Sequence, residues 1–363
     1  MKHKLSERIK NFNITILISL FLLISCGSGQ QPQAGKDGEA ATGGRSLSAV
    51  LMEVGRSAEN AFYSFLELLS DTLGFTAKST TTKDDVGKYF IGLSEKLGKA
   101  SEELEEVAKK SEIDVDEGGL LNKVIKESVE AAKEVLGVLK TNVDSLKDVG
   151  DSNLVGWAAS DKEGTAADVT ELKKAYNAFK GIVETADKEG VTKSGAGNTT
   201  VKVGSANNKD GAKILAIDSA GKPAAGDVAK AAAILASVSG EEILASIVNS
   251  TEGDADTGVG GQATSNTSAV AFAKGGNGAN LAQDAAKAAA VAGGIALRSL
   301  VKDGKLAANN NDDDKVAQSA GVAAVNKLLV AVEDIIKKTV KNVLKTVKDK
   351  IDEARAPKSA GQQ

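Results

Sequence analysis

Reactive side chains are scarce in this chain of 363 residues, which has one cysteine and one histidine. The histidine, His3, and the cysteine, Cys26, both lie near the N-terminus. The rest of the chain therefore cannot build a Ser-His-Asp or Cys-His nucleophile, a zinc site with nitrogen and sulfur ligands, or a disulfide framework. We expect a protein that is not an enzyme and that uses no metal or other cofactor.

Aromatic residues make up only 3% of the chain, and it has three prolines and one tryptophan. Because ligand pockets are usually lined with aromatic and large aliphatic side chains, this composition does not favour a small-molecule site. The formal net charge is −4, which offers no basic surface of the kind that nucleic-acid binding requires. Alanine, valine and leucine dominate the apolar residues, which favours close-packed helices over a sheet protein.

The N-terminus has the pattern of a bacterial lipoprotein signal. Four basic residues precede an apolar run over 14–24, which is too short to span a membrane. Leu23-Ile24-Ser25-Cys26 then places the cysteine after a small residue. We predict cleavage between Ser25 and Cys26, followed by acylation of Cys26, and several acyl chains anchor a protein almost irreversibly. The alternative is an ordinary secretory signal with an incidental cysteine.

Cleavage would remove four basic residues and one acidic residue, so the formal charge of the mature chain would move from −4 to −7. Residues after the cysteine are rich in Gly, Gln and Ala and show no apolar period, which is typical of a flexible tether. We predict four segments: a signal peptide over 1–25, a lipidated tether over 26–46, a single helical ectodomain over 47–355, and a disordered tail over 356–363. We expect the N- and C-terminal helices of this ectodomain to pack together.

Apolar residues recur at intervals of three and four along most of the ectodomain, as on one face of a helix. This spacing predicts helices over 47–73, 86–107, 120–146, 166–187, 226–248, 281–301 and 325–351. Gly293-Gly294 is expected to break or bend the sixth helix. The last helix has the longest stripe, which favours the spine of a bundle over the alternative of a helix on a lipid surface.

Two polar stretches interrupt this pattern, and we expect residues 190–211 and 251–280 to form long exposed loops. Short strands are expected only over 199–203 and 213–217. Asp254 and Asp256 resemble the start of a calcium loop, but Ser265 stands where the loop needs glutamate, so a turn is favoured. The predicted fold class is all-α: an elongated helical bundle with long Gly/Asn/Thr-rich loops and at most a few short β-strands.

Three runs of sequence resemble the variable large proteins of relapsing-fever Borrelia, also called variable major proteins, and the related variable surface antigen of Lyme-disease Borrelia. The runs are VLMEVGRSAENAFYSF from Val50, YFIGLSEKL from Tyr89 and IALRSLVKDGKL from Ile295. The resemblance covers essentially the whole chain. It implies a helical lipoprotein of the cell outer membrane, with terminal helices near the membrane and variable loops at the distal end. Family members are expressed one at a time, and switching between them evades host antibody.

The resemblance and the residue pattern together predict a surface-exposed variable antigen, with the outer membrane and host antibodies as its partners. We expect accessible variation in 190–213 and 251–280, with further exposed positions in 151–165 and 307–315. Segment 291–307 should be largely buried, because Ile295, Leu297, Leu300 and Leu306 give it an apolar face. The alternative function is an adhesin or a binder of host surface or serum proteins. The pattern leaves a homodimer open, although one continuous bundle is favoured.

Overall fold

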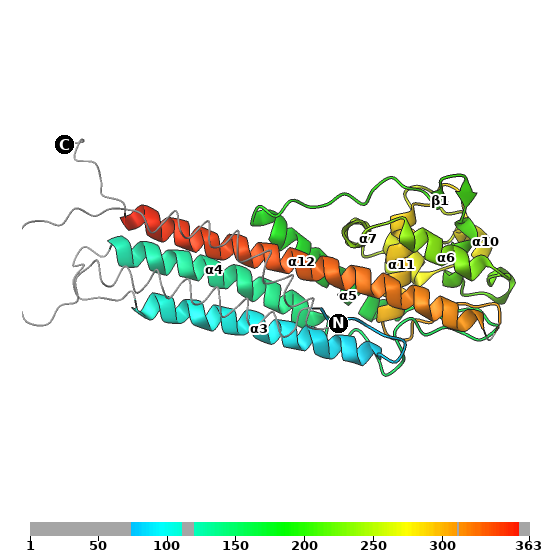
Figure 1. Cartoon of the computed structure of the whole chain (residues 1–363), viewed down its shortest axis with the longest axis horizontal. Coiled ribbons are helices and arrows are strands. Elements are labelled where there is room, and N and C mark those ends of the chain that lie inside the picture. Colours follow the sequence, from blue (N-terminus) through cyan, green and yellow to red (C-terminus); the bar gives the residue numbers. More distant parts are fainter. Residues whose placement is uncertain (1–73, 111–119, 311, 356–363) are drawn as a thin grey trace, which may run out of the picture. The chain divides into compact units, whose positions relative to one another are not determined.

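The computed structural model describes residues 74–110, 120–310 and 312–355. Its longest elements are the helices α3 (Lys83–Lys110), α4 (Leu120–Ser145) and α12 (Asp313–Arg355). Helix α4 packs against both α3 and α12, and α3 and α4 run antiparallel (Figure 1). Lys133 of α4 accordingly pairs with Glu105 of α3 at 2.9 Å. We call α3, α4 and residues 333–355 of α12 the three-helix region.

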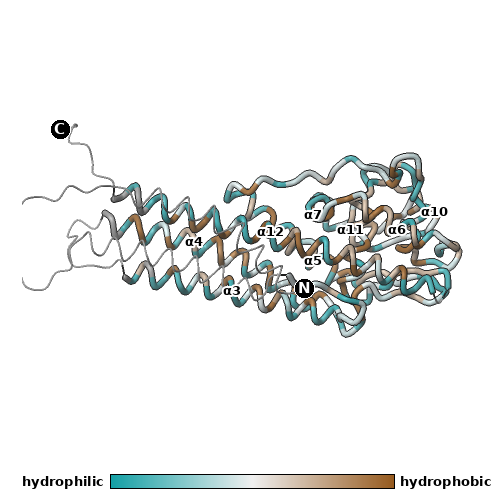
Figure 2. Tube along the Cα trace, viewed as in Figure 1, coloured by the Kyte–Doolittle hydropathy of each residue, from teal (hydrophilic) through white to brown (hydrophobic). Residues whose placement is uncertain are grey.

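The predicted apolar seams of these helices are buried. Phe90, Leu97 and Leu104 of α3 are fully buried at intervals of seven residues, which places them on one face of the helix. Polar and apolar residues alternate along all three helices (Figure 2). Helix α12 buries apolar side chains between residues 317 and 347 and packs on α4, α5, α6, α7 and α11. It is therefore the spine of the bundle, as the apolar stripe predicts.

The chain between α4 and α12, residues 146–310, is called here the loop-rich region. Its longer helices are α5 (Val169–Lys188), α6 (Asp227–Ala236), α7 (Gly240–Val248) and α11 (Ala288–Leu300). Its shorter elements are the strands β1 (Lys202–Val203) and β2 (Ala206–Asn207), the 3-10 helices η1 (Lys209–Leu215) and η2 (Ser219–Gly221), and the helices α8 (Asp254–Thr257), α9 (Ala269–Lys274) and α10 (Gly278–Leu281).

The all-α fold class is confirmed, because the strands named among the described residues form a single two-stranded hairpin. Within the described ranges, no single helix has the length and apolar content of a membrane span, and the bent pair of α6 and α7 meets that criterion only as a pair. The predicted signal peptide, tether, first helix over 47–73 and C-terminal tail lie outside the described residues.

The helix predicted over 226–248 is wrong in one respect, because the structure has two helices, α6 and α7, bent by 98°. Ser239 and Glu242 form a capping box that starts a new helix at this point. Lys327 of α12 donates from Nζ to the carbonyl oxygens of Leu235 and Val238, at 2.7 and 2.6 Å. These bonds satisfy carbonyl groups at the end of α6, so the chain can turn without losing hydrogen bonds.

The helix predicted over 281–301 starts later than expected, at Ala288, and Gly293-Gly294 does not break it. Residues just before the helix pair instead with another segment, since Ala286 O accepts a hydrogen bond from Val201 N at 3.0 Å. The two glycines are helical and buried, and because they have no side chain, α9 can pack directly against the backbone of α11. A Cβ at Gly294 would lie 2.4 Å from the Cβ of Phe272.

The long loop expected over 251–280 contains three short helices, α8, α9 and α10. Elements of four to six residues are too short to show a helical period, and polar caps define them instead. Ser268 and Asn277, for example, accept backbone N–H groups at the starts of α9 and α10. The strand expected over 213–217 is also wrong, because residues 209–215 form η1, whereas β1 lies within the strand expected over 199–203.

Candidate functional site

Two stretches of the loop-rich region, residues 192–207 and 251–268, expose most of their side chains. We call these stretches together the loop surface. The side chains buried within them are small or β-branched: Val201, Ala255, Val259 and Ala263. The predicted exposure of 190–213 and 251–280 is therefore confirmed over most of their length. It is wrong for Gly211 and Ala212, which η1 buries, and for residues 269–275, where α9 enters the core.

The loop surface is attached to the interior at a few backbone positions. Val259 N donates to Gly275 O at 2.9 Å, and Ala263 N donates to Asn280 O at 2.8 Å. These two bonds fix one stretch of the loop surface, and the bond from Val201 to Ala286 fixes the other. The exposed side chains between these positions add little to the core, so they can change at small cost in stability.

The buried guanidinium of Arg298 connects the bases of several loops. It donates to Ala273 O at 2.5 Å and to Thr165 O at 2.8 Å, with longer bonds to Lys305 O and Leu215 O, at 3.3 and 3.5 Å. Arg298 is fully buried, and burial lowers its pKa to about 9. Thr165 O and Lys305 O also accept a backbone N–H group from each other's residue, whereas Ala273 O and Leu215 O receive their donor from Arg298.

A second buried cation, Lys83, joins the start of α3 to the loop-rich region. Its Nζ donates to Val301 O at 2.6 Å and to Gly304 O at 2.8 Å. Burial lowers the pKa of Lys83 to about 8, and the charge of Asp151 opposes this shift. Asp151 accepts the N–H of Asp303 at 2.8 Å, so the turn at 301–304 is bound from two sides.

Arg298 lies within segment 291–307, and Lys83 binds it. The segment is largely buried as predicted, although Lys302 and Asp303 are exposed. The run from Ile295 to Leu306 is therefore a structural segment. The sequence pattern did not predict the roles of Arg298 and Lys83. A signal was available for Arg298, because it is the only charged residue in the apolar stretch 288–301. A charge there must be buried with polar partners.

Ion pairs tie the loop surface to neighbouring elements. Asp284 accepts hydrogen bonds or ion pairs from Lys202, Lys209 and Asn207, at 2.8, 3.1 and 2.9 Å. The bond from Lys202, with further bonds from Asn207 and Lys209, holds the pKa of Asp284 well below its usual range. This exposed carboxylate therefore fixes the β1–β2 hairpin to the chain that precedes α11.

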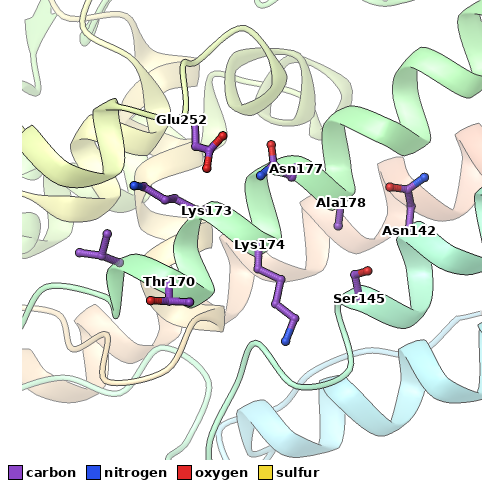
Figure 3. Close-up of a pocket in the computed structure, with 9 residues that line it drawn as sticks. Asn142, Ser145, Thr170, Lys173, Lys174, Asn177, Ala178 and Glu252 are labelled. Carbon is purple, nitrogen blue, oxygen red and sulfur yellow. The ribbon is translucent and has the colours of Figure 1, made fainter.

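A shallow depression of about 510 Å³ lies between α4, α5 and the turn at Glu252. Most of its lining residues are polar or charged, and Lys174 points away from Glu252 (Figure 3). Lys173, also in the lining, pairs with Asp256 at 2.8 Å. The lining has no aromatic, imidazole or thiol group, and the described residues contain no cluster of His, Cys, Asp and Glu that could hold a metal ion.

Comparison with known proteins gives a consistent picture. Residues 58–351 match the sequence model of a family described as Borrelia lipoprotein. The chain is 60% identical to Variable large protein 25 of Borrelia hermsii and 55% identical to Variable large protein 18, over the whole of each chain. Variable large protein 4 of the same organism is 30% identical, over 92% of this chain and 91% of that one.

A solved structure shows the same fold. The crystal structure of the Lyme disease variable surface antigen VlsE of Borrelia burgdorferi aligns with a TM-score of 0.65 and 25% identity. The alignment covers 84% of this chain and 98% of that one. The expected resemblance is therefore confirmed by sequence and by structure.

Proposed function

This chain belongs to the Borrelia lipoprotein family, within its variable surface antigens, and we propose that it is a non-catalytic outer-surface antigen that evades host antibody by replacement. The organism would switch expression among related members, each presenting a different loop surface on the same helical fold. The relatives support this idea, because Borrelia hermsii has several full-length members that are between 28% and 60% identical to this chain.

The observation that carries the proposal is the separation of the loop surface from the groups that hold the fold. The core cations bind backbone carbonyl groups, and the seams of α3, α4 and α12 are apolar. Backbone carbonyls are present whatever the side chain, so exposed residues can change without removing these bonds. Antibodies recognise side chains, so such changes would remove an epitope and leave the fold intact.

The proposed anchor is the acylated N-terminal Cys26, which cleavage after Ser25 would expose. Multiple acyl chains would hold the protein in the outer membrane with its loop surface accessible to antibody. Replacing Cys26 with alanine should abolish incorporation of labelled fatty acid and release the protein from the membrane fraction. Labelled Cys26→Ala protein would instead place the lipid on another residue.

Antibody selection on a clonal population tests the proposal directly. Cells expressing this protein are grown with an antibody that binds the loop surface, and the expressed locus is sequenced in the survivors. We expect survivors to express a different family member, or this fold with replaced loop residues. An antibody that neither binds intact cells nor selects changes would contradict surface exposure, and a role in binding or structure would then have to replace antigenic variation.

A further inference from the structure

The chain between α5 and β1 is fixed at both ends and unsupported between them. At the upstream end, Asn342 of α12 donates from its amide to Glu189 O at 2.9 Å. At the downstream end, Lys287 pairs with the side chain of Asn198 at 3.3 Å, and Thr199 O accepts Ala288 N at 2.9 Å. Residues 192–195 are all exposed, and this segment crosses the surface without regular structure (Figure 1).

The backbone of residues 192–197 forms no hydrogen bond within the described part of the chain. An endoprotease must bind its substrate as an extended strand, which usually requires local unfolding of the target. Here the strand is already available, because its backbone groups have no other partners. One basic residue, Lys193, lies within it and is exposed.

We infer that the bond between Lys193 and Ser194 is a processing site for a trypsin-like serine protease. Water adds across this amide bond, which leaves a carboxylate on Lys193 and a new amino group on Ser194. Exposure of this segment and its lack of backbone hydrogen bonds to the described residues make it a cleavage site whether or not the protein is a variable antigen.

Other lysines in irregular chain are less suited to cleavage. Lys78 lies in a turn, where its N–H donates to Thr81 Oγ1 at 2.9 Å and its carbonyl accepts Thr81 N at 3.0 Å. Lys222 is half-buried and its Nζ pairs with Asp161. It also precedes Pro223, which has no N–H and blocks trypsin-like cleavage.

Lys162 and Lys302 are exposed too, but their backbone is already bonded: Lys162 O accepts Ala308 N at 3.2 Å, and Lys302 N donates to Val149 O at 2.7 Å. Lys193 is therefore the favoured position among these lysines.

Cleavage at Lys193 should leave the fold assembled, because the two fragments interlock on both sides of the cut. On the upstream fragment, Lys83 binds carbonyl groups of the 301–304 turn, and Tyr176 of α5 donates to Ser250 O at 2.9 Å. Helix α4 packs along α12, which belongs to the downstream fragment. The two fragments would thus stay associated after the protease has cut the chain.

Limited digestion of the purified full chain with trypsin tests the site. We expect the fastest cut within 74–110, 120–310 and 312–355 to give a fragment that starts at Ser194, at least tenfold faster than any other cut there. Lys193→Gln and Ser194→Pro should each abolish this fragment, the first by removing the recognised side chain and the second by blocking the bond. The matched control, Lys78→Gln, should leave the fragment unchanged.

Association is measured on the cut protein. The two fragments should co-elute in native size-exclusion chromatography and separate only under denaturing conditions, with the midpoint of thermal unfolding within a few degrees of the intact chain. A first cut at Lys78 or at another described residue would overturn the site. Fragments that separate without denaturant would overturn the conclusion that the cut protein remains assembled.

Discussion

The three-helix region and the loop-rich region both bury apolar side chains, but they satisfy their backbone polar groups by different means. In the three-helix region, the helices satisfy their own backbone groups, and apolar seams join them. The loop-rich region contains much irregular chain whose carbonyl groups need other donors. Arg298, Lys83 and Lys327 supply those donors from buried or half-buried positions. Regular backbone can thus rely on apolar packing, whereas irregular backbone needs specific polar side chains.

This difference affects how each region responds to change. An apolar seam depends on the size and position of many side chains, so most substitutions along it are felt. The loop-rich region also has a buried apolar core, and a few cations and close glycine contacts are needed in addition to it. Only the exposed side chains of the loop surface are free to vary. Matched substitutions in each region test this difference.

The largest effect is expected for Arg298→Met. This change leaves the carbonyl groups of Ala273 and Leu215 without their donor, and unsatisfied buried groups cost about 1–3 kcal/mol each. We expect the free energy of unfolding to fall by about 4 kcal/mol. Urea unfolding can be followed by the fluorescence of Trp157, the only tryptophan. Lys305 Nζ lies over its ring, 4.4 Å from the ring centre, within the loop-rich region.

Arg298→Lys is the control for charge, because it retains the cation but cannot reach several carbonyls at once. It should lose most of the same stability. A loss of less than about 1 kcal/mol in Arg298→Met would show that apolar packing, and not carbonyl binding, holds the loop-rich region.

A smaller effect is expected for Leu97→Ala in the three-helix region. Leu97 is fully buried in the seam of α3, and removing its side chain should cost about 3 kcal/mol. Lys99→Ala, two residues away and exposed, should change stability by less than about 0.5 kcal/mol. Urea unfolding curves measure both, and equal effects would contradict a seam at this face.

The sequence predicts the helices of the three-helix region better than those of the loop-rich region, because regular helices show an apolar period and short irregular elements do not. Helices α3, α4 and α5 have long apolar periods, and their bounds are predicted to within a few residues. The apolar stripe predicted over 325–351 lies within α12, which starts earlier, at Asp313. Helices α8, α9 and α10 are set by caps and by contacts distant in sequence, such as Phe272 against Gly294, which no local period reveals.

Within the candidate site, the exposed part could be predicted from the sequence and the buried polar contacts could not. Exposed polar stretches predict most of the loop surface, because exposure follows from composition. The carbonyl-binding roles of Arg298 and Lys83 could not be assigned, because their partners lie up to 133 and 221 residues away in sequence. The predicted lipidation at Cys26 lies outside the described residues and remains a prediction.

Alanine at two glycines should have opposite effects in the two regions. Gly294→Ala places a Cβ against Phe272, and overpacking of this kind costs about 2 kcal/mol. Gly137 of α4 is exposed, and a Cβ added there would meet no atom within 4 Å, so Gly137→Ala should stabilise by about 0.5–1 kcal/mol through helix propensity. Thermal unfolding measures both, and effects of the same sign would contradict the close contact at Gly294.

The smallest effect is expected for an insertion in the unsupported segment. Six Gly and Ser residues placed between Gly195 and Ala196 lengthen a loop whose backbone forms no hydrogen bonds there. Because loop closure costs only about 0.6 kcal/mol per doubling of length, stability should fall by less than about 1 kcal/mol. The same insertion between Gly98 and Lys99 would separate Leu97 from Leu104 on their seam and should prevent cooperative unfolding. If both insertions cost the same, loop length would be as constrained as helix register, and the loop surface could not accept the length changes that replacement of an antigen requires.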